Sequence, residues 1–413
     1  MLFTKPLLEI TGSDIQSLCD EHYPETDQVE YKEFLPGKEG PDGWHKGADS
    51  ISEYARDQLF AEVIALANTR GGHLILGVKE SSENPKRAVS PTPVPRCHDL
   101  ATRLTQAAYS CIEPTLNDLQ IVGISVGTGD SGVVLFRIRQ SSNAPHRLIK
   151  NRHCYYRRGE NTVSLTMREI QDLTLSTVRG MQRIQDRLAA FRSDFHTKAN
   201  TNVTSTHKGW VSYRITSVPV TPLRIQPRAI QSTLLTRKSQ FDVYYQRSER
   251  REIFVSPIGL NNRPVLRGTM IYKHESPVSF EHSAFLDGSQ SLTNVTMHDF
   301  QDQSTRGVRL SHILGAAASV LSTAKSIADL GSMPAAEFAV EMEITSTAGA
   351  PNLYTVMGTT PSWQFDREQF LLPQYSHISE DGLCDLLSLI QRDLYNSAGQ
   401  PYDDVIESVK SVG

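Results

Sequence analysis

The sequence lacks a regular cysteine pattern. Its five cysteines are odd in number, scattered over 413 residues, and contain no C-x-x-C pair. Such a set argues against a disulfide framework and against a zinc site. It favours a reducing compartment, and we expect a cytoplasmic protein. The five are Cys19, Cys97, Cys111, Cys154 and Cys384.

Long hydrophobic runs are also missing. The first ten residues contain no signal-peptide core, and no apolar run approaches the ~20 residues that span a bilayer. Residues 312–330 predict an Ala-rich helix that is too polar to be transmembrane. We therefore expect a soluble chain without a membrane partner.

The sequence also lacks a large excess of either sign of charge. The chain has 42 Lys and Arg against 46 Asp and Glu, a formal net charge of −4. This argues against a protein covered in basic surface and leaves room for a local basic patch.

The length indicates two domains, each with its own core. We predict an α+β protein with an N-terminal α/β domain over 1–178, a connecting helix and polar linker over 179–207, and a second α+β domain over 208–413. The connection is expected to include helices over 167–173 and 183–195.

Residues 65–80 combine several local signals. A helical apolar pattern ends at Asn68, the chain reverses at Gly71 and Gly72, and an apolar strand follows over 73–78. Glu80 then lies where the strand emerges, within reach of a ligand. The alternative is an ordinary helix-to-strand connection with a surface glutamate.

Residues 29–34 predict a strand with one accessible face, which Glu30 and Lys32 share. Glu25 follows Pro24 ahead of the strand, so strand alternation does not fix its direction and it can turn toward Glu30. A helix capped by Ser50 or Ser52 is expected to run to residue 68. Another, capped by Ser13, is expected over 13–20.

Residues 35–49 contain four glycines and two prolines and predict a long loop. The spacing invites comparison with a phosphate-binding loop. The G-K-[ST] ending and a preceding apolar strand are absent, however, so a mobile loop beside a site is the preferred interpretation.

A basic and aromatic run follows a predicted hairpin over 119–126 and 132–139. Cations between aromatic rings suit a nucleic-acid backbone with splayed bases. The alternative is a solvated strand edge guarded by charge. The run comprises Arg147, Lys150, Arg152, Tyr155, Tyr156, Arg157 and Arg158.

The second half offers no metal-ligand spacing and no nucleophile motif. We predict strands over 210–215, 241–245, 252–256, 268–272 and 338–345, and an amphipathic helix over 381–394. This half is interpreted as a substrate-selecting, partner-binding or oligomerising domain.

Three patterns in order resemble the Schlafen-type AlbA domain, a family once grouped with divergent AAA ATPases. They are Glu25-x4-Glu30-Tyr-Lys32, residues 65–78 with an acid two residues later, and Tyr155-Tyr-x-Arg158-Gly with its trailing helix. The resemblance covers roughly residues 20–175. It departs from the family's nucleases in carrying Glu rather than Asp as the third acid, and in the Gly-rich segment after Phe34.

In Schlafen members that cleave tRNA or rRNA, three acids form a metal-binding catalytic centre. The resemblance places these roles on Glu25, Glu30 and Glu80. Oxygen ligands suit Mg²⁺ or Mn²⁺, which can activate water and steady the leaving oxygen of a phosphodiester. Lys32 would then stabilise transition-state charge, and the basic run would grip the backbone.

The resemblance implies a metal-dependent endoribonuclease acting on structured RNA such as tRNA, as an effector in bacterial stress or antiviral defence. One alternative is a non-catalytic DNA- or RNA-binding module of a transcriptional regulator. Another is ATP binding, for which a Walker motif is missing. With any of these three functions, the chain could form a homo-oligomer or bind a partner protein from a defence system.

Overall fold

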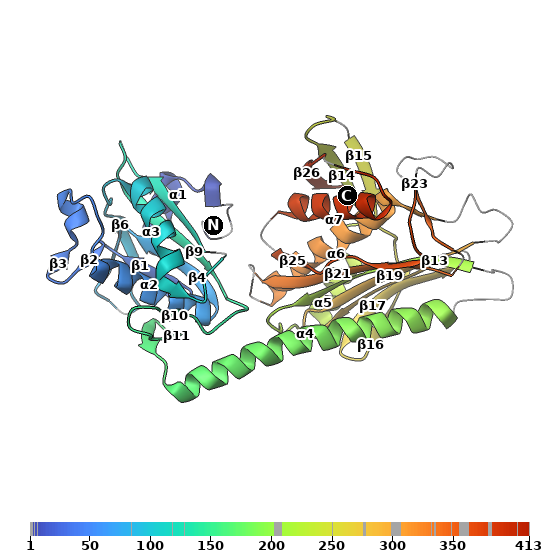
Figure 1. The fold of residues 1–413 in the computed structure, drawn as a ribbon, viewed down its shortest axis with the longest axis horizontal. Helices are drawn as coiled ribbons and strands as arrows, with labels where there is room; N and C mark the ends of the chain where they lie inside the picture. Colours follow the sequence, from blue (N-terminus) through green and yellow to red (C-terminus); the bar gives the residue numbers. More distant parts are fainter. Residues whose placement is uncertain are drawn as a thin grey trace. The chain divides into compact units, whose positions relative to one another are not determined.

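A computed structural model describes residues 3, 5, 7–83, 85–117, 119–127, 129–201, 209–249, 251–275, 278–298, 307–331, 333, 336–347, 349–354, 363–378, 382–402 and 404–412. The chain is α+β and divides into two compact units, Met1–Arg179 and Gly180–Gly413. Figure 1 labels their helices and strands.

A four-stranded mixed sheet organises unit 1. Its order is β1-β4-β9-β8, with β1 parallel to β4 and the other pairs antiparallel. The strands β8 and β9 confirm the predicted hairpin. The bounds are β1 Val29–Lys32, β4 Gly71–Leu76, β8 Gln120–Ser125 and β9 Gly132–Arg139.

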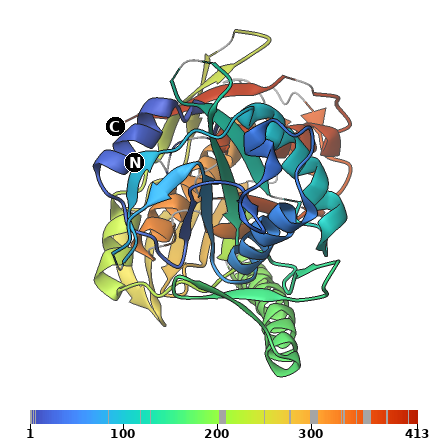
Figure 2. The same cartoon turned by 90° about the vertical axis from the view of Figure 1, so that its left-hand side faces the viewer.

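Helices cover both faces of this sheet, as Figure 2 shows. Helices α2 (Glu53–Asn68) and α3 (Cys97–Cys111) pack with Leu74 and Phe136 in one core cluster, and α1 (Gly12–Asp20) packs with Ile75 in another. Successive strand residues point to opposite faces, so one strand supplies both clusters.

Side-chain caps define two helix starts. The Ser52 hydroxyl accepts a hydrogen bond from Ala55 N, which confirms one of the two predicted caps of α2. Helix α1 starts one residue earlier than predicted, and Thr11 rather than Ser13 forms a capping box with Asp14.

The Gly-rich segment 35–49 is more structured than predicted. It forms the short pair β2 (Pro36–Gly37) and β3 (Gly40–Pro41) and a 3₁₀ helix, η3 (Gly43–Lys46). Trp44 is fully buried and anchors the segment, and its indole donates to Pro95 O at 2.7 Å. The prediction of a loop missed this anchor.

One continuous helix, α4 (Met167–Thr201), replaces the two short helices and the start of the predicted linker. Residues 202–208 lie outside the described residues. Within unit 2, Ile184, Leu188 and Phe191 of this helix pack against Val218 and Ala339, which explains why helix continues through a polar sequence.

Unit 2 contains a large antiparallel sheet. The order is β16-β17-β18-β19-β13-β21-β24, and β25 also pairs with β21. The bounds are β13 Gly209–Pro219, β16 Asn261–Val265, β17 Gly268–Glu275, β18 Val278–Phe285, β19 Gln290–His298, β21 Glu337–Ser346, β24 Gln369–Leu371 and β25 Tyr375–Ile378.

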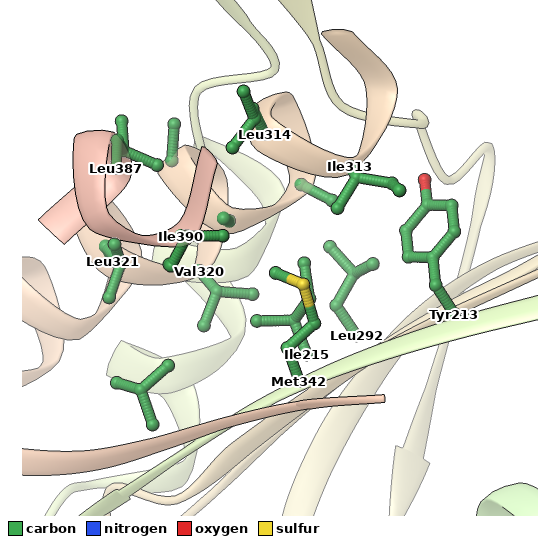
Figure 3. Close-up of a cluster of buried hydrophobic side chains, with 14 of the residues drawn as sticks. Tyr213, Ile215, Leu292, Ile313, Leu314, Val320, Leu321, Met342, Leu387 and Ile390 are labelled. Atoms are coloured by element: carbon green, nitrogen blue, oxygen red, sulfur yellow. The ribbon is translucent and has the colours of Figure 1, made fainter. Parts of the chain in front are cut away.

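The two faces of this sheet differ in polarity. Tyr213 and Ile215 of β13 face an apolar core with α6 (Leu310–Leu330) and α7 (Leu383–Ser397), shown in Figure 3. Arg214, between them, is buried on the other face and pairs with Glu341 and Glu343 of β21.

By length and composition alone, helix α6 could cross a membrane. The expectation that this helix is too polar to do so is therefore wrong. In this structure 72% of the apolar window is buried inside the protein. It is the central helix of the unit 2 core.

The remaining elements are short. They are η2 Leu7–Glu9, β5 Val78–Glu80, β6 Ala88–Pro91, β7 Ile112–Glu113, β10 Arg147–Leu148, β11 Tyr155–Arg158, β12 Asn161–Ser164, α5 Pro227–Leu235, β14 Gln240–Tyr245, β15 Arg251–Val255, β20 Gly307–Arg309, β22 Asn352–Tyr354, β23 Trp363–Gln364 and β26 Ile406–Ser411.

Candidate active site

Strand β1 presents Glu30 and Lys32 on the face opposite Tyr31. Tyr31 is fully buried in the α1-side core, so its neighbours point toward the side covered by α2. The Glu30 side chain is 6% exposed and forms an ion pair with Lys32. The predicted shared face is confirmed.

Arg157 of β11 lies against this face of β1 and contacts the Glu30 carboxylate. Its Nη1 lies 2.7 Å from Glu30 Oε2 and 3.2 Å from Glu62 Oε2, and Nη2 donates to Thr26 O at 3.1 Å. The Arg157 side chain is fully buried. The interpretation of Arg157 as a surface contact for nucleic acid is therefore corrected: it holds carboxylates together inside the domain.

Glu25 turns toward the same place from the segment before β1. Its Oε1 accepts a hydrogen bond from Tyr31 N at 2.9 Å, and its own backbone N donates to Lys86 O at 2.8 Å. Burial and the nearby Glu30 carboxylate raise the pKa of Glu25 to about 7, with a further contribution from Glu80.

Glu80 ends β5, opposite Ala88 of β6. Lys86 donates to Glu80 Oε1, whereas Glu80 Oε2 is buried and has no hydrogen-bond partner among the described residues. A buried carboxylate oxygen without a donor is energetically costly and is a natural ligand position for a cation.

Lys32 bridges two acids. Besides Glu30 it lies 3.9 Å from Glu62 Oε1. Burial lowers the pKa of Lys32, but the Glu30 and Glu62 carboxylates outweigh burial and raise the pKa overall. Lys32 therefore remains a cation beside the acids.

Glu62 was missed by sequence reasoning. It belongs to α2, and its carboxylate accepts hydrogen bonds from Arg157 and from the Thr162 hydroxyl of β12. No local motif marks it, because its partners come from strands far along the chain. The acid cluster, as we name it, comprises Glu25, Glu30, Glu62 and Glu80 with the cations Lys32, Lys86 and Arg157.

The donors of the acid cluster are carboxylate oxygens, which suit Mg²⁺ or Mn²⁺. Glu80 Oε2 fits such an ion because it is buried and unpartnered. The ligand atoms of Glu25, Glu30 and Glu80, however, do not all lie within 4.8 Å of one another. In this arrangement the lysines Lys32 and Lys86 neutralise the acids.

The predicted basic run is largely paired with acids. Arg147 lies 2.8 Å from Glu113, and Lys150 lies 2.7 Å from Glu53. Arg158 pairs with Glu169. The positive charges of these three residues are therefore compensated, which favours the interpretation as a solvated, charged strand edge over an open basic patch for nucleic acid.

Arg152 and the two tyrosines complete the run. Arg152 is exposed at φ +62° and forms no ion pair with another described residue. Tyr155 packs against the α2-side core and accepts a hydrogen bond from Asn151, and Tyr156 is half-buried. Neither ring is fully free for base stacking.

Comparison with known protein families gives a match to the N-terminal part of the chain. Residues 25–166 match the family model described as Schlafen, AlbA_2. This match confirms the suspected family for the N-terminal part and indicates a nucleic-acid-related function.

The chain is also similar to the solution NMR structure of the N-terminal domain of a putative ATP-dependent DNA helicase RecG-related protein from Nitrosomonas europaea. The identity is 17%, over 36% of this chain and 88% of that one, with a TM-score of 0.25. No curated protein matches the chain.

Proposed function

Starting from a Schlafen AlbA_2 domain in the N-terminal part, we propose that unit 1 is a metal-dependent endoribonuclease that cleaves structured RNA such as tRNA at the acid cluster. The observation that carries the proposal is the convergence of three acids from separate segments. The Glu25 carboxylate accepts from the backbone of Tyr31, next to Glu30, and the Glu25 backbone donates to Lys86, whose side chain pairs with Glu80. Glu30 and Glu80 accordingly both raise the pKa of Glu25.

To hold Mg²⁺ or Mn²⁺, which would supply Lewis-acid activation of water and of the phosphate, the Glu25, Glu30 and Glu80 carboxylates must move closer together than in this structure. The chain's own residues have separate tasks. Arg157 fixes the Glu30 carboxylate through its fully buried guanidinium. Lys32, 31% exposed, is the cation placed to stabilise negative charge on a phosphate at this site.

The test uses the purified chain with a labelled tRNA pool, single-stranded DNA and double-stranded DNA, each in Mg²⁺, Mn²⁺ or EDTA. We expect RNA fragments with either metal and none in EDTA, in Glu30→Gln or in Glu80→Gln. Glu83→Gln is the matched control, since Glu83 is an exposed acid just beyond β5. Binding without cleavage under every metal would overturn the proposal.

A second candidate is nucleic-acid binding without cleavage, as in a transcriptional regulator. It is favoured by the internal compensation of the acid cluster, where Lys32, Lys86 and Arg157 already neutralise the carboxylates. The same experiment separates the two functions, because mobility shifts that persist in EDTA and in Glu30→Gln belong to a binding module.

The cellular setting is proposed from the resemblance and from the cysteines. The five cysteines are free and four of them are buried, which suits a cytoplasmic protein. We propose a role as an effector in bacterial stress or antiviral defence, with unit 2 selecting the substrate, binding a partner protein or forming an oligomer.

A further inference from the structure

We propose that Cys97, His98 and Asp130 form a second metal site, which takes a transition-metal ion such as Zn²⁺ and is separate from the acid cluster. One ligand atom from each residue can be chosen so that all three lie within 4.8 Å of one another. Of the described residues, these are the ones that meet this distance condition.

The site joins two segments that are distant in sequence. Cys97 and His98 open α3, directly after Arg96, which takes a left-handed conformation at φ +52°. Asp130 lies in the connection between β8 and β9. The site thus links the start of a helix to the end of the hairpin beneath it.

Backbone contacts hold these segments in place without an ion. Cys97 N donates to Asp130 O at 3.0 Å, and Val94 and Gly132 exchange backbone hydrogen bonds of 2.6 and 3.0 Å. Gly123 of β8 lies so close to α3 that a Cβ there would come 2.7 Å from the Cys97 carbonyl. The fold therefore brings the backbone segments that carry the three donors together.

The donor set indicates the kind of ion. A thiolate, an imidazole and a carboxylate are the ligands of Zn²⁺, whereas Mg²⁺ prefers oxygen alone. Cys97 is fully buried, and His98 and Asp130 are exposed, so water can reach a fourth position. Ser125 Oγ lies 3.0 Å from His98 Nε2 and helps to orient the ring.

Cysteine spacing alone argued against a zinc site, because no C-x-x-C pair exists. The proposed ligands are instead one adjacent Cys-His pair and an aspartate brought in by the β8–β9 connection. An ion at this position fastens α3 to the hairpin and stabilises unit 1.

The test is a Co²⁺ titration of the full chain after chelator treatment. We expect a thiolate-to-cobalt charge-transfer absorption that saturates at one Co²⁺ per chain. Zn²⁺ should abolish this absorption by displacing the Co²⁺, and Mg²⁺ should leave it unchanged. Cys97→Ser abolishes the absorption, and Cys111→Ser, at the other end of α3, retains it. Glu30→Gln also retains it, which separates this site from the acid cluster.

His98→Asn and Asp130→Asn change exposed side chains and keep the fold intact. Because loss of an outer-shell partner already costs 10–100-fold in metal affinity, we expect each variant to weaken Co²⁺ binding by at least about tenfold. Wild-type protein without the thiolate absorption, or an unchanged affinity in both variants, would overturn the site.

Discussion

Arg157 and Arg158 are neighbours in the sequence with opposite environments. The Arg157 guanidinium is fully buried between Glu30 and Glu62, whereas the Arg158 side chain is 58% exposed beside Glu169. Removing one partner of a buried pair leaves an uncompensated charge, while an exposed pair contributes little.

We expect Arg157→Met to lower the free energy of unfolding of unit 1 by about 3–5 kcal/mol. The matched control, Arg158→Met, should lower it by less than about 1 kcal/mol. Hydrogen exchange of the β4 amides in the full chain measures both variants locally. Equal effects would contradict the assignment of Arg157 as the internal clamp.

Glu25 makes stability depend on pH. Its pKa is raised from the usual 4.5 to about 7, mainly by burial and by Glu30. Between these pH values the folded chain keeps a proton that the unfolded chain releases, so the free energy of unfolding falls as the pH rises through this window. The shift corresponds to about 3 kcal/mol.

Glu25→Gln should remove this slope, because the amide oxygen still accepts from Tyr31 N while no charge forms. Denaturant unfolding of both proteins between pH 4.5 and 7.5 measures the difference. Bound Mg²⁺ would lower the Glu25 pKa and flatten the wild-type slope, so the same series in Mg²⁺ and in EDTA also tests the proposed cofactor.

At the scale of elements, Gly72 sets the pairing of β4 with β1. It has φ +146°, and a Cβ there would come 2.1 Å from Gln28 O. The next amide, His73 N, donates to that same oxygen at 2.7 Å. This close approach starts the parallel register that places Glu30 opposite Leu74.

Gly72→Ala should therefore destabilise unit 1 strongly, by about 3 kcal/mol or more. Gly159→Ala is the control, since Gly159 has φ +61° and open space around its missing Cβ, and it should cost only about 1–2 kcal/mol. Thermal unfolding compares them. Similar midpoints would mean that β4 tolerates a side chain at this position.

The long helix α4 shows how packing overrides a local pattern. Its sequence predicts two helices and a polar linker, yet the helix runs unbroken to Thr201. Apolar contacts on the unit 2 sheet and an ion pair between Lys198 and Glu281 stabilise its second half. These partners lie far along the chain and are invisible to a local window.

At the scale of the whole molecule, the net charge is only −4, and cations of the basic run such as Arg147, Lys150 and Arg158 are compensated by local ion pairs. We expect the proposed nucleic-acid binding to depend on cations that have no carboxylate partner among the described residues. Arg152 is such a cation, exposed in the connection between β10 and β11.

Arg152→Gln should weaken RNA binding and reduce the slope of log K against log salt by about 0.7–0.9, the value for one phosphate contact. Arg168→Gln is the control, an 83% exposed arginine that pairs with Asp172, and it should leave the slope unchanged. Filter binding at several salt concentrations measures both. An unchanged slope for Arg152→Gln would remove Arg152 from the interface.

The sequence by itself determined the local features of unit 1: the face shared by Glu30 and Lys32, the Ser52 cap of α2, and the β8–β9 hairpin. Caps, alternation and turn residues act over a few neighbouring positions, so a local pattern contains them. The acids Glu25, Glu30 and Glu80 are predicted as a set from the resemblance to the Schlafen-type AlbA domain, which rests on three ordered local patterns.

Only the tertiary structure decided the burial of Arg157, the participation of Glu62 and the meeting of Cys97 and His98 with Asp130. Each depends on segments separated by whole helices or strands. Their proximity follows from sheet order and from helix packing, which bury apolar faces without regard to the polar residues carried along. Charge compensation inside the acid cluster is a property of that packing.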